Sequence, residues 1–403
     1  MRIAFFTDFV APPQNGVWTS IINLSSILSS MGHEIIIFTP KPASKKSIKL
    51  VDTRITIKFL PSIPGFLYPD LRLGFPISPD LIKKIKALRI DIIHVHSQLS
   101  VGLGGVFIGK ILKVPIISTQ HNYAMEEDFL EIINIHYMTK QVSSFLWKFT
   151  AFFLNQSDRI IAPTEMIRTD LLKHEIHPEV LVLPNTIQAH EVKLISATEL
   201  QKLKKRLRLK KNVILFVGRL SKEKSVDLLL ESFSRVIKVE ADTSLLIVGD
   251  GPQSTSLKKL SKRLGISSHV VFTGEIDQEK LLTKGYYQLA NLFATASMTE
   301  VQPVSLIEAM YFGLPVVGIA KLGILEMMKN IGLLSMSHSR QEFADNILKV
   351  LQSDTLHAKL MQKSFAKYKS TYEPAIVATE YVRICESLQR MKRNSQEQQL
   401  LLS

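Results

Sequence analysis

The hydrophobic residues of this chain fall into short uninterrupted runs, and stretches with helical spacing lie between them. Residues 1–10 (MRIAFFTDFV) predict a buried strand, and residues 11–16 (APPQNG) predict the loop that follows it. Residues 17–32 carry apolar side chains at helical spacing and end at Gly32, after which residues 33–40 form a second β-branched run. This order of strand, loop, helix and strand predicts a parallel sheet covered by helices.

The same pattern recurs along the chain in two series. The further strand-like runs are residues 90–97, 114–121 and 159–166 in the first series, and residues 211–220, 244–252, 269–276, 290–297 and 314–320 in the second. Between the two series, Pro184 and Asn185 interrupt another strand-like segment. The sequence therefore predicts an α/β protein of two doubly wound, Rossmann-like domains that face an interdomain cleft.

The predicted domain limits follow from these series. Residues 1–187 are expected to form the first domain and residues 188–375 the second, and Rossmann-type halves of this kind make a nucleotide site the default expectation. Residues 376–403 are expected to form a C-terminal helix that can cross back to the first domain and ends in a polar tail.

Composition narrows the class of protein. A length of 403 residues with 46% hydrophobic and 21% charged residues is typical of a globular chain of about two domains. The single cysteine, Cys385, excludes an internal disulfide framework and favours a reducing compartment. Asp8 interrupts the first apolar run, so no signal peptide is expected, and no segment approaches the roughly 20 apolar residues of a membrane span. We expect a cytoplasmic protein, soluble or peripheral on the inner face of the cell membrane.

The formal net charge of +14 points to anionic partners or to solubility alone. Phosphate-bearing substrates and an anionic membrane surface are the two partners favoured here. The sequence has no zinc-finger, RNA-binding-strand or basic-zipper signature, so we expect no nucleic-acid partner.

Two basic residues follow the strand predicted at 211–218. Arg219 lies at its carboxyl end, and Lys224 comes directly before an amphipathic helix. A guanidinium and an ammonium at a helix N-terminus can bind a diphosphate, whereas the alternative is two solvated cations on a loop. The tight turn Gly249–Gly251 at the next strand end is interpreted as structural.

Two glutamates bracket the segment TEVQPVSLIEAM. Pro303 is expected to begin a helix, which leaves Glu300 in the loop before it and places Glu308 within the helix. Helix N–H groups near residues 303–306 would point at an anion. Alternatively, Glu308 is an exposed helix residue and Glu300 only a favourable charge near the helix start.

Three histidines follow strand-like runs in the first half. His94 and His96 alternate with Val95 and so point to the same side of their strand. A metal site would need a third ligand close by, and none is evident, so a buried and hydrogen-bonded side chain is the preferred interpretation of His94. His121 likewise follows a strand, the one predicted at 114–120.

The ordered motifs FFTDFVAPPQNGV, GHEIIIFTP, GRLSKEK, IVGDGP and TE with seven residues before EAMYFGLPVV resemble the retaining glycosyltransferases of family four, which have the GT-B fold. The resemblance covers nearly the whole chain. It implies that Glu300 holds hydroxyls of the transferred sugar and Glu308 those of the ribose, while Arg219 and Lys224 bind the diphosphate. The other residues that it places near donor or acceptor are Gly16, Val301, Pro303, Val304 and His121, of which His121 is a candidate catalytic residue. It also implies that the first domain binds the acceptor or a membrane and the second the nucleotide-sugar.

The resemblance also implies the chemistry. Cations placed at the departing nucleoside diphosphate would lower the barrier most, and the chain has no Asp-X-Asp motif. We therefore expect a metal-independent transferase without a cofactor, in which the leaving phosphate takes the acceptor proton. Two departures from the family pattern, PNTIQ at 184–188 and VQP at 301–303, leave the role of the first loop and the identity of the sugar open.

Aromatic and proline-rich segments of the first half are similar to the glycolipid-forming branch, whose members glucosylate diacylglycerol. These segments are residues 59–76, 91–97 and 119–129, and residues 136–156 add a stretch rich in aromatic and basic residues. Tyr137, Phe145, Trp147, Phe149 and Phe152 alternate there with Lys140 and Lys148, which suits a helix lying in an anionic membrane interface or, equally, one packed on its own sheet. The expected reaction transfers a hexose, expected to be glucose, from a UDP-sugar to a diacylglycerol-type lipid. Rival interpretations are a soluble sugar, polyprenyl-linked glycan or small-metabolite acceptor, a nucleotide-sugar epimerase, and an inactive binding module.

Overall fold

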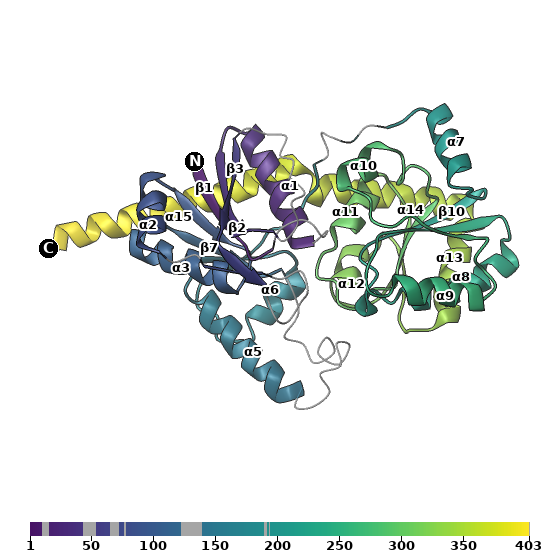
Figure 1. The fold of residues 1–403 in the computed structure, drawn as a ribbon, viewed down its shortest axis with the longest axis horizontal. Coiled ribbons are helices and arrows are strands. Elements are labelled where there is room, and N and C mark those ends of the chain that lie inside the picture. The colour runs from purple at the N-terminus through teal and green to yellow at the C-terminus, as the bar shows by residue number, and fades with distance from the viewer. Residues whose placement is uncertain are drawn as a thin grey trace. The chain divides into compact units, whose positions relative to one another are not determined.

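The computed structural model describes residues 1–9, 16–42, 54–64, 72–75, 78–121, 139–188, 192 and 194–402. They form two compact units (Figure 1). The first unit contains the described residues within 1–125, 140–187 and 374–403, and the second contains Thr139 and the described residues within 188–373. The first unit is therefore assembled from chain segments that lie on both sides of the second in the sequence.

A parallel sheet forms the centre of the first unit, with strand order β3-β2-β1-β6-β7-β8-β9. Its strands are β1 (Arg2–Phe6), β2 (Glu34–Pro40), β3 (Ile55–Leu60), β6 (Ile92–Val95), β7 (Ile116–Thr119), β8 (Arg159–Ala162) and β9 (Glu179–Val182). Ile3 of β1 pairs with Ile35 of β2 on one side and with Ile92 of β6 on the other. The strand order changes direction between β1 and β6, and such a switch point is where ligands bind in doubly wound sheets.

Helices cover both faces of this sheet. They are α1 (Gly16–Ser30), α2 (Pro79–Ala87), α3 (Ser100–Leu112), α5 (Thr139–Leu154), α6 (Glu165–Leu171) and α15 (Pro374–Leu402), and a small antiparallel pair joins β4 (Ser62–Pro64) to β5 (Arg72–Gly74). Phe5 and Ile37 share one buried core with residues of α1 and α15, among them Trp18 and Tyr381. The last helix of the chain thus completes the core of the first unit.

The other face of the first sheet is covered by α3, whose contact side is made of glycines. A Cβ at Gly105 would lie 2.7 Å from the ring of Phe6, and one at Gly109 would lie 2.6 Å from Ile116. These distances are too short for real side chains, so only glycine lets the helix backbone approach the sheet this closely. Val101 and Ile108 are buried with the glycines, whereas Leu103, Phe107 and Ile111 lie on the outer side of α3.

The second unit has a parallel sheet of order β12-β11-β10-β13-β14-β15. Its strands are β10 (Asn212–Val217), β11 (Thr243–Val248), β12 (Val270–Phe272), β13 (Leu292–Thr295), β14 (Val316–Ile319) and β15 (Leu333–Ser335). Its helices are α7 (Ala197–Arg206), η2 (Lys222–Lys224), α8 (Val226–Val239), α9 (Ser254–Arg263), α10 (Gln278–Thr283), α11 (Val304–Tyr311), α12 (Leu322–Met328), α13 (Arg340–Leu351), α14 (Asp354–Lys367) and η3 (Tyr368–Tyr372). The switch point of this sheet lies between β10 and β13.

One core of the second unit lies between its sheet and a group of neighbouring helices. Phe216 and Ile247 of the sheet share this buried core with Phe233 of α8 and Phe343 of α13. Figure 1 shows α8, α9 and α13 grouped beside the sheet. The parallel, helix-covered architecture predicted from the apolar runs is confirmed in both units.

Three features differ from the sequence prediction. The edge strands β3 and β15 and the pair of β4 and β5 were not expected, and α11 begins at Val304 rather than at Pro303. Pro303 is the N-cap, with extended backbone at ψ 125°, because the chain still turns into the helix at this residue. None of the described helices combines the length and hydropathy that a membrane-spanning segment needs.

Candidate active site

The switch point of the second sheet brings two of the predicted residues together. Lys224 ends the turn η2 that follows β10, and Glu300 lies in the loop that follows β13. The ammonium of Lys224 donates to Oε1 of Glu300, and the two side chains are only 21% and 17% exposed. Partial burial keeps water from screening this ion pair fully, so each partner holds the other in a defined position.

Backbone hydrogen bonds tie these two loops to each other. The N–H of Met298 donates to the carbonyl of Glu223 at 3.1 Å, and the hydroxyl of Ser297 donates to the same carbonyl at 3.3 Å. The turn carrying Lys224 and the loop carrying Glu300 are thereby fixed to each other by main-chain as well as side-chain contacts. A site built this way needs little reorganisation when a ligand arrives.

Arg219 lies two residues beyond the end of β10, partly buried, as its sequence position predicts. The next strand end supports its loop, since the N–H of Leu220 donates to the carbonyl of Asp250 at 2.9 Å. Gly249 has φ +137°, and a Cβ there would lie 1.9 Å from the carbonyl oxygen of Gly218. The turn at Gly249 therefore acts as a backbone support for the loop of Arg219, in agreement with its structural interpretation.

The loop of Glu300 is supported by a residue that the sequence analysis missed. The N–H of Gly323 in α12 donates to the carbonyl of Glu300 at 2.9 Å. A Cβ at Gly323 would lie 1.5 Å from the carbonyl oxygen of Val301, so no other residue fits this approach. The only sequence signal was a glycine near the start of a helix. Val301 and Val304, predicted near the donor, are mostly buried, and Pro303 between them is half-buried.

Glu308 is a buried carboxylate, not the exposed helix residue of the alternative interpretation. Its side chain is 3% exposed, the hydroxyl of Tyr287 donates to Oε2, and Nε2 of Gln278 donates to Oε1 at 2.6 Å. Burial raises the pKa of Glu308 to about 7, an effect that these two hydrogen bonds partly offset. Tyr287 and Gln278 gave no signal in the sequence, because both lie on segments distant from α11.

His121 lies at the end of β7 in the first unit, in a row of three histidines. Its Nε2 is 2.9 Å from Nδ1 of His96. The ring of His94 lies 3.9 Å from that of His96 and bonds to Tyr381 and Thr119, so the preferred interpretation of His94 as a buried, hydrogen-bonded residue is confirmed. Burial lowers the pKa of all three imidazoles, that of His121 to about 4.

Two residues of the first unit lie between β1 and the start of α1, next to the switch point of the first sheet. Gly16 is exposed at the first position of α1, where an added Cβ would meet nothing within 4 Å. Asp8 follows β1 and accepts hydrogen bonds from the N–H groups of Val101 and Gly102, at 2.8 and 3.2 Å. Asp8 therefore caps α3 and is structural. The loop before Gly16 and most of residues 119–138 lie outside the described residues.

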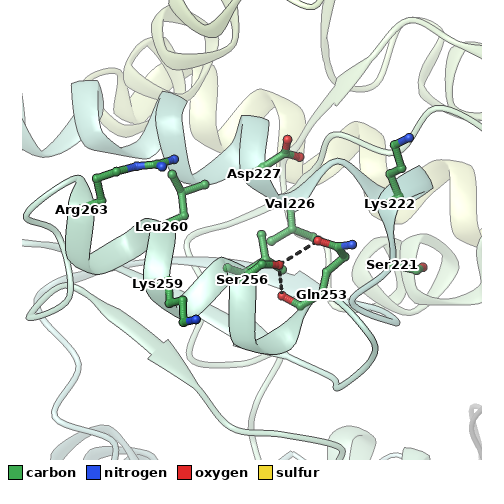
Figure 2. A pocket seen from close by; sticks show the side chains of 10 residues that line it. Ser221, Lys222, Val226, Asp227, Gln253, Ser256, Lys259, Leu260 and Arg263 are labelled. Carbon is green, nitrogen blue, oxygen red and sulfur yellow. Dashed lines mark hydrogen bonds between the residues drawn. The ribbon is translucent and has the colours of Figure 1, made fainter.

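A cavity of about 440 Å³ lies beside the loop of Arg219 (Figure 2). It is formed by η2, the start of α8, and α9, with Lys222 and Arg263 at opposite ends of the group drawn and Asp227 between them. Neither Arg219, Lys224, Glu300 nor Glu308 lines it. This groove is therefore separate from the candidate site, which we place at the switch point on the evidence of the contacts above.

Comparison with protein families and with known proteins gives matches over most of the chain. Residues 14–191 match the family model Glycosyltransferase Family 4, and residues 197–367 match Glycosyl transferases group 1. The chain is 30% identical to an alpha-monoglucosyldiacylglycerol synthase of Streptococcus pneumoniae over 87% of this chain and 78% of that protein. It is 27% identical to the enzyme of the same name from Acholeplasma laidlawii, over 79% of this chain and 80% of that protein.

Solved structures support the fold. The Anabaena protein HepE, solved in complex with UDP and glucose, superposes with a TM-score of 0.75 at 18% sequence identity. The match covers 96% of this chain and 99% of that protein. At this identity the likeness concerns the arrangement of strands and helices, which agrees with the two parallel sheets described above.

Proposed function

Because this chain belongs to glycosyltransferase family 4, we propose that it transfers a hexose from a UDP-sugar to a hydroxyl of a diacylglycerol-type lipid. We expect this hexose to be glucose. The protein is a glycosyltransferase of the GT-B fold. The similarity to two alpha-monoglucosyldiacylglycerol synthases over most of the chain is the observation that supports the lipid acceptor. We further propose that the reaction retains the anomeric configuration, requires no metal, and takes place at the inner face of the cell membrane.

The chemistry assigns a role to each residue of the candidate site. Arg219 and Lys224 bind the diphosphate and stabilise the charge that develops as it departs. Glu300 accepts hydrogen bonds from hydroxyls of the sugar, while its ion pair with Lys224 keeps it in place before the donor binds. The acceptor hydroxyl attacks the anomeric carbon from the face that the diphosphate leaves, and its proton passes to the departing phosphate oxygen. No separate protein base is needed in this scheme.

Glu308 has the hydrogen-bonding capacity that a ribose diol requires. A carboxylate offers about four lone-pair positions, and Tyr287 and Gln278 occupy two of them. The remaining two match the paired hydroxyls of a ribose. Only the ionised form has this full acceptor capacity, so the protonation state of Glu308 should control donor affinity.

Donor binding is therefore expected to depend on pH. With a pKa of about 7, Glu308 is mostly protonated at pH 6 and mostly ionised at pH 8, so the affinity for UDP-glucose should rise about tenfold over this range. Titration calorimetry without acceptor measures this directly, and the diester phosphates of UDP-glucose do not titrate there. The Glu308→Gln variant is the control, because Tyr287 can rotate its hydroxyl to accept from the amide. An equal pH dependence in both proteins would contradict the assignment.

The membrane surface is supported by two helices of the first unit. The outer side of α3 carries Leu103, Phe107 and Ile111, all at least 40% exposed, next to the exposed Lys110. A cavity of about 310 Å³ between α2 and α3 is lined by cations as well as apolar residues. Apolar side chains flanked by cations suit an anionic lipid surface.

The helix α5 packs on its own unit, which is one of the two alternatives left open by its sequence, and its exposed side supports the proposed contact with a membrane. Trp147 and Phe153 are buried against the first unit, whereas Phe145 and Phe152 are 68% and 63% exposed, with Lys148 exposed between them. Tyr137 lies outside the described residues. The helix therefore packs on its own unit through one side and presents aromatic and basic residues on the other.

Removal of the exposed phenylalanines of α5 should weaken membrane binding. We expect the double variant Phe145→Ser with Phe152→Ser to bind anionic vesicles about tenfold more weakly, since each ring loses apolar contact area with the interface. Co-sedimentation with vesicles of phosphatidylglycerol and phosphatidylcholine measures the partition. Leu194→Ser, at a residue 72% exposed in the second unit, is the matched control. Equal sedimentation of the wild type and the double variant would show that this side of α5 does not bind the membrane.

The reaction itself is tested by UDP release from UDP-glucose, with and without diacylglycerol in anionic vesicles. Lipid-dependent release together with a new glucolipid supports the proposal. Release that does not respond to lipid indicates hydrolysis of the donor and leaves the acceptor assignment without support. Consumption of the donor without any UDP would indicate an epimerase instead.

A further inference from the structure

Three neighbouring histidines of the first unit, His94, His96 and His121, make ring contacts and hydrogen bonds that the proposed reaction does not by itself explain. Nδ1 of His94 lies 3.0 Å from the hydroxyl of Tyr381 in α15, and Nε2 lies 2.7 Å from Oγ1 of Thr119. Both ring nitrogens of His94 are thus engaged. The only ring nitrogen within hydrogen-bond distance of His96, among the described residues, is Nε2 of His121, at 2.9 Å from Nδ1.

The bond between His96 and His121 can take two forms. Burial lowers the pKa of both rings, so at neutral pH each imidazole carries one proton. In the first form, His96 donates from Nδ1, and His121 must carry its own proton on Nδ1. In the second form, His121 donates from Nε2, and His96 must carry its proton on its far nitrogen, Nε2.

The surroundings of His96 favour the first form. Its side chain is 3% exposed, and its Nε2 is buried without a hydrogen-bond partner among the described residues. In the second form this atom would be a buried N–H with no acceptor, and orphaned buried N–H groups are rarer in proteins than under-satisfied acceptors. In the first form it is only an unused lone pair. The ring of Phe5 lies against His96 at 4.9 Å between centroids and offers no conventional acceptor.

We propose that His96 is a positioning residue, which donates its Nδ1–H to His121 and fixes His121 in the tautomer protonated at Nδ1. The consequence for the reaction rests on the proposed function together with the family resemblance, which implies that His121 lies near the transferred sugar and the acceptor. His121 then presents an N–H to a substrate oxygen. It acts as a hydrogen-bond donor and not as a base, which agrees with a transfer in which the leaving phosphate takes the proton.

The tautomer can be measured without any substrate. The full chain, with all of its 11 histidines labelled with ¹⁵N, is examined by long-range ¹H–¹⁵N correlation, which distinguishes rings protonated at Nδ1 from rings protonated at Nε2. The His121→Gln and His96→Gln spectra assign the two signals. We expect both rings to be neutral and protonated at Nδ1. A His121 signal protonated at Nε2 would overturn the proposal.

Two variants at residue 96 test the consequence for catalysis. In His96→Asn the amide nitrogen occupies the place of Nδ1 and can still donate to His121, whereas in His96→Gln it lies nearer the place of Nε2. We expect His96→Gln to lower kcat about tenfold with little change in KM for UDP-glucose, and His96→Asn to retain kcat within about twofold. Equal losses in both variants, with equal thermal stability, would show a merely structural role for His96.

The two experiments separate this inference from the proposed function. If the wild type transfers glucose to no lipid, the proposed function fails while the tautomer measurement still decides whether His96 donates to His121. If transfer is observed but His121 is protonated at Nε2, the inference fails and the function stands. If His96→Gln does not fold, the His121→Gln spectrum still assigns the His121 signal of the wild type, and the tautomer of that ring decides.

Discussion

Glu300→Gln is expected to lower kcat by about 10²–10³-fold, the loss typical of removing one preorganised electrostatic contact from a transition state. Glutamine keeps an acceptor for Lys224 but removes the negative charge that pairs with it. The sugar hydroxyls lose their charge-assisted hydrogen bonds, whereas the cation at the diphosphate is no longer neutralised. We therefore expect the affinity for UDP to stay the same or to increase while turnover falls.

This divergence between affinity and turnover distinguishes a site residue from a structural one. UDP affinity is measured by calorimetry, and kcat by UDP release with diacylglycerol vesicles. Glu279→Gln, at an exposed glutamate of α10 in the same unit, should leave both quantities unchanged. Full turnover in the folded Glu300→Gln protein would show that Glu300 does not take part in the reaction.

Arg219→Ala is expected to lower kcat/KM by about 10²–10³-fold, because Arg219 is proposed to stabilise charge on the departing diphosphate. A guanidinium can donate two parallel hydrogen bonds to phosphate oxygens, whereas an ammonium acts as a single point charge. Arg219→Lys should therefore recover only part of the loss. The loop itself should survive either change, since main-chain bonds from Leu220 to Asp250 and from Gln253 to Leu220 support it.

The measurement compares initial rates over a range of UDP-glucose concentrations for both Arg219 variants. Arg235→Ala, at an exposed arginine of α8, is the control for loss of one positive charge from the second unit. Unchanged kcat/KM in Arg219→Ala would show that the diphosphate does not bind at the end of β10. Equal activity of Arg219→Lys and the wild type would mean that charge alone matters there.

The central strands were predictable because burial on both faces leaves an unmistakable apolar run. Ile3 to Phe6 in β1 and Val213 to Phe216 in β10 are almost entirely buried. The edge strand β3 was missed because Thr56, Lys58 and Phe59 are exposed, so its residues do not form such a run. An edge strand is paired on one side only and tolerates polar residues that a central strand would exclude.

The positions of the site residues were predictable, but their contacts were not. Arg219 and Lys224 follow a strand closely enough for the sequence to place them at its carboxyl end. The ion pair between Lys224 and Glu300 joins residues 76 positions apart, and it depends on β10 and β13 being neighbours in the sheet. Nothing local in the sequence indicates the order of strands.

The buried partners of the titratable residues were hidden for the same reason. Tyr381 lies 287 positions from His94, and Tyr287 lies 21 positions from Glu308 on a separate segment. Patterns of period two or about 3.6 describe one strand or helix at a time. They identify which residues are buried and leave open which side chains meet there.

The division of the first unit between the two ends of the chain has a consequence for synthesis on the ribosome. The core around β1 and α1 requires Tyr381 and its neighbours in α15, which are made after the whole second unit. At ordinary elongation rates this delay lasts roughly 10 to 40 s. During that time the apolar side of α1 that α15 will cover is exposed, while the second unit, whose described residues apart from Thr139 follow one another in the chain, can already fold. We therefore expect the first unit to complete its core only after α15 has been synthesised.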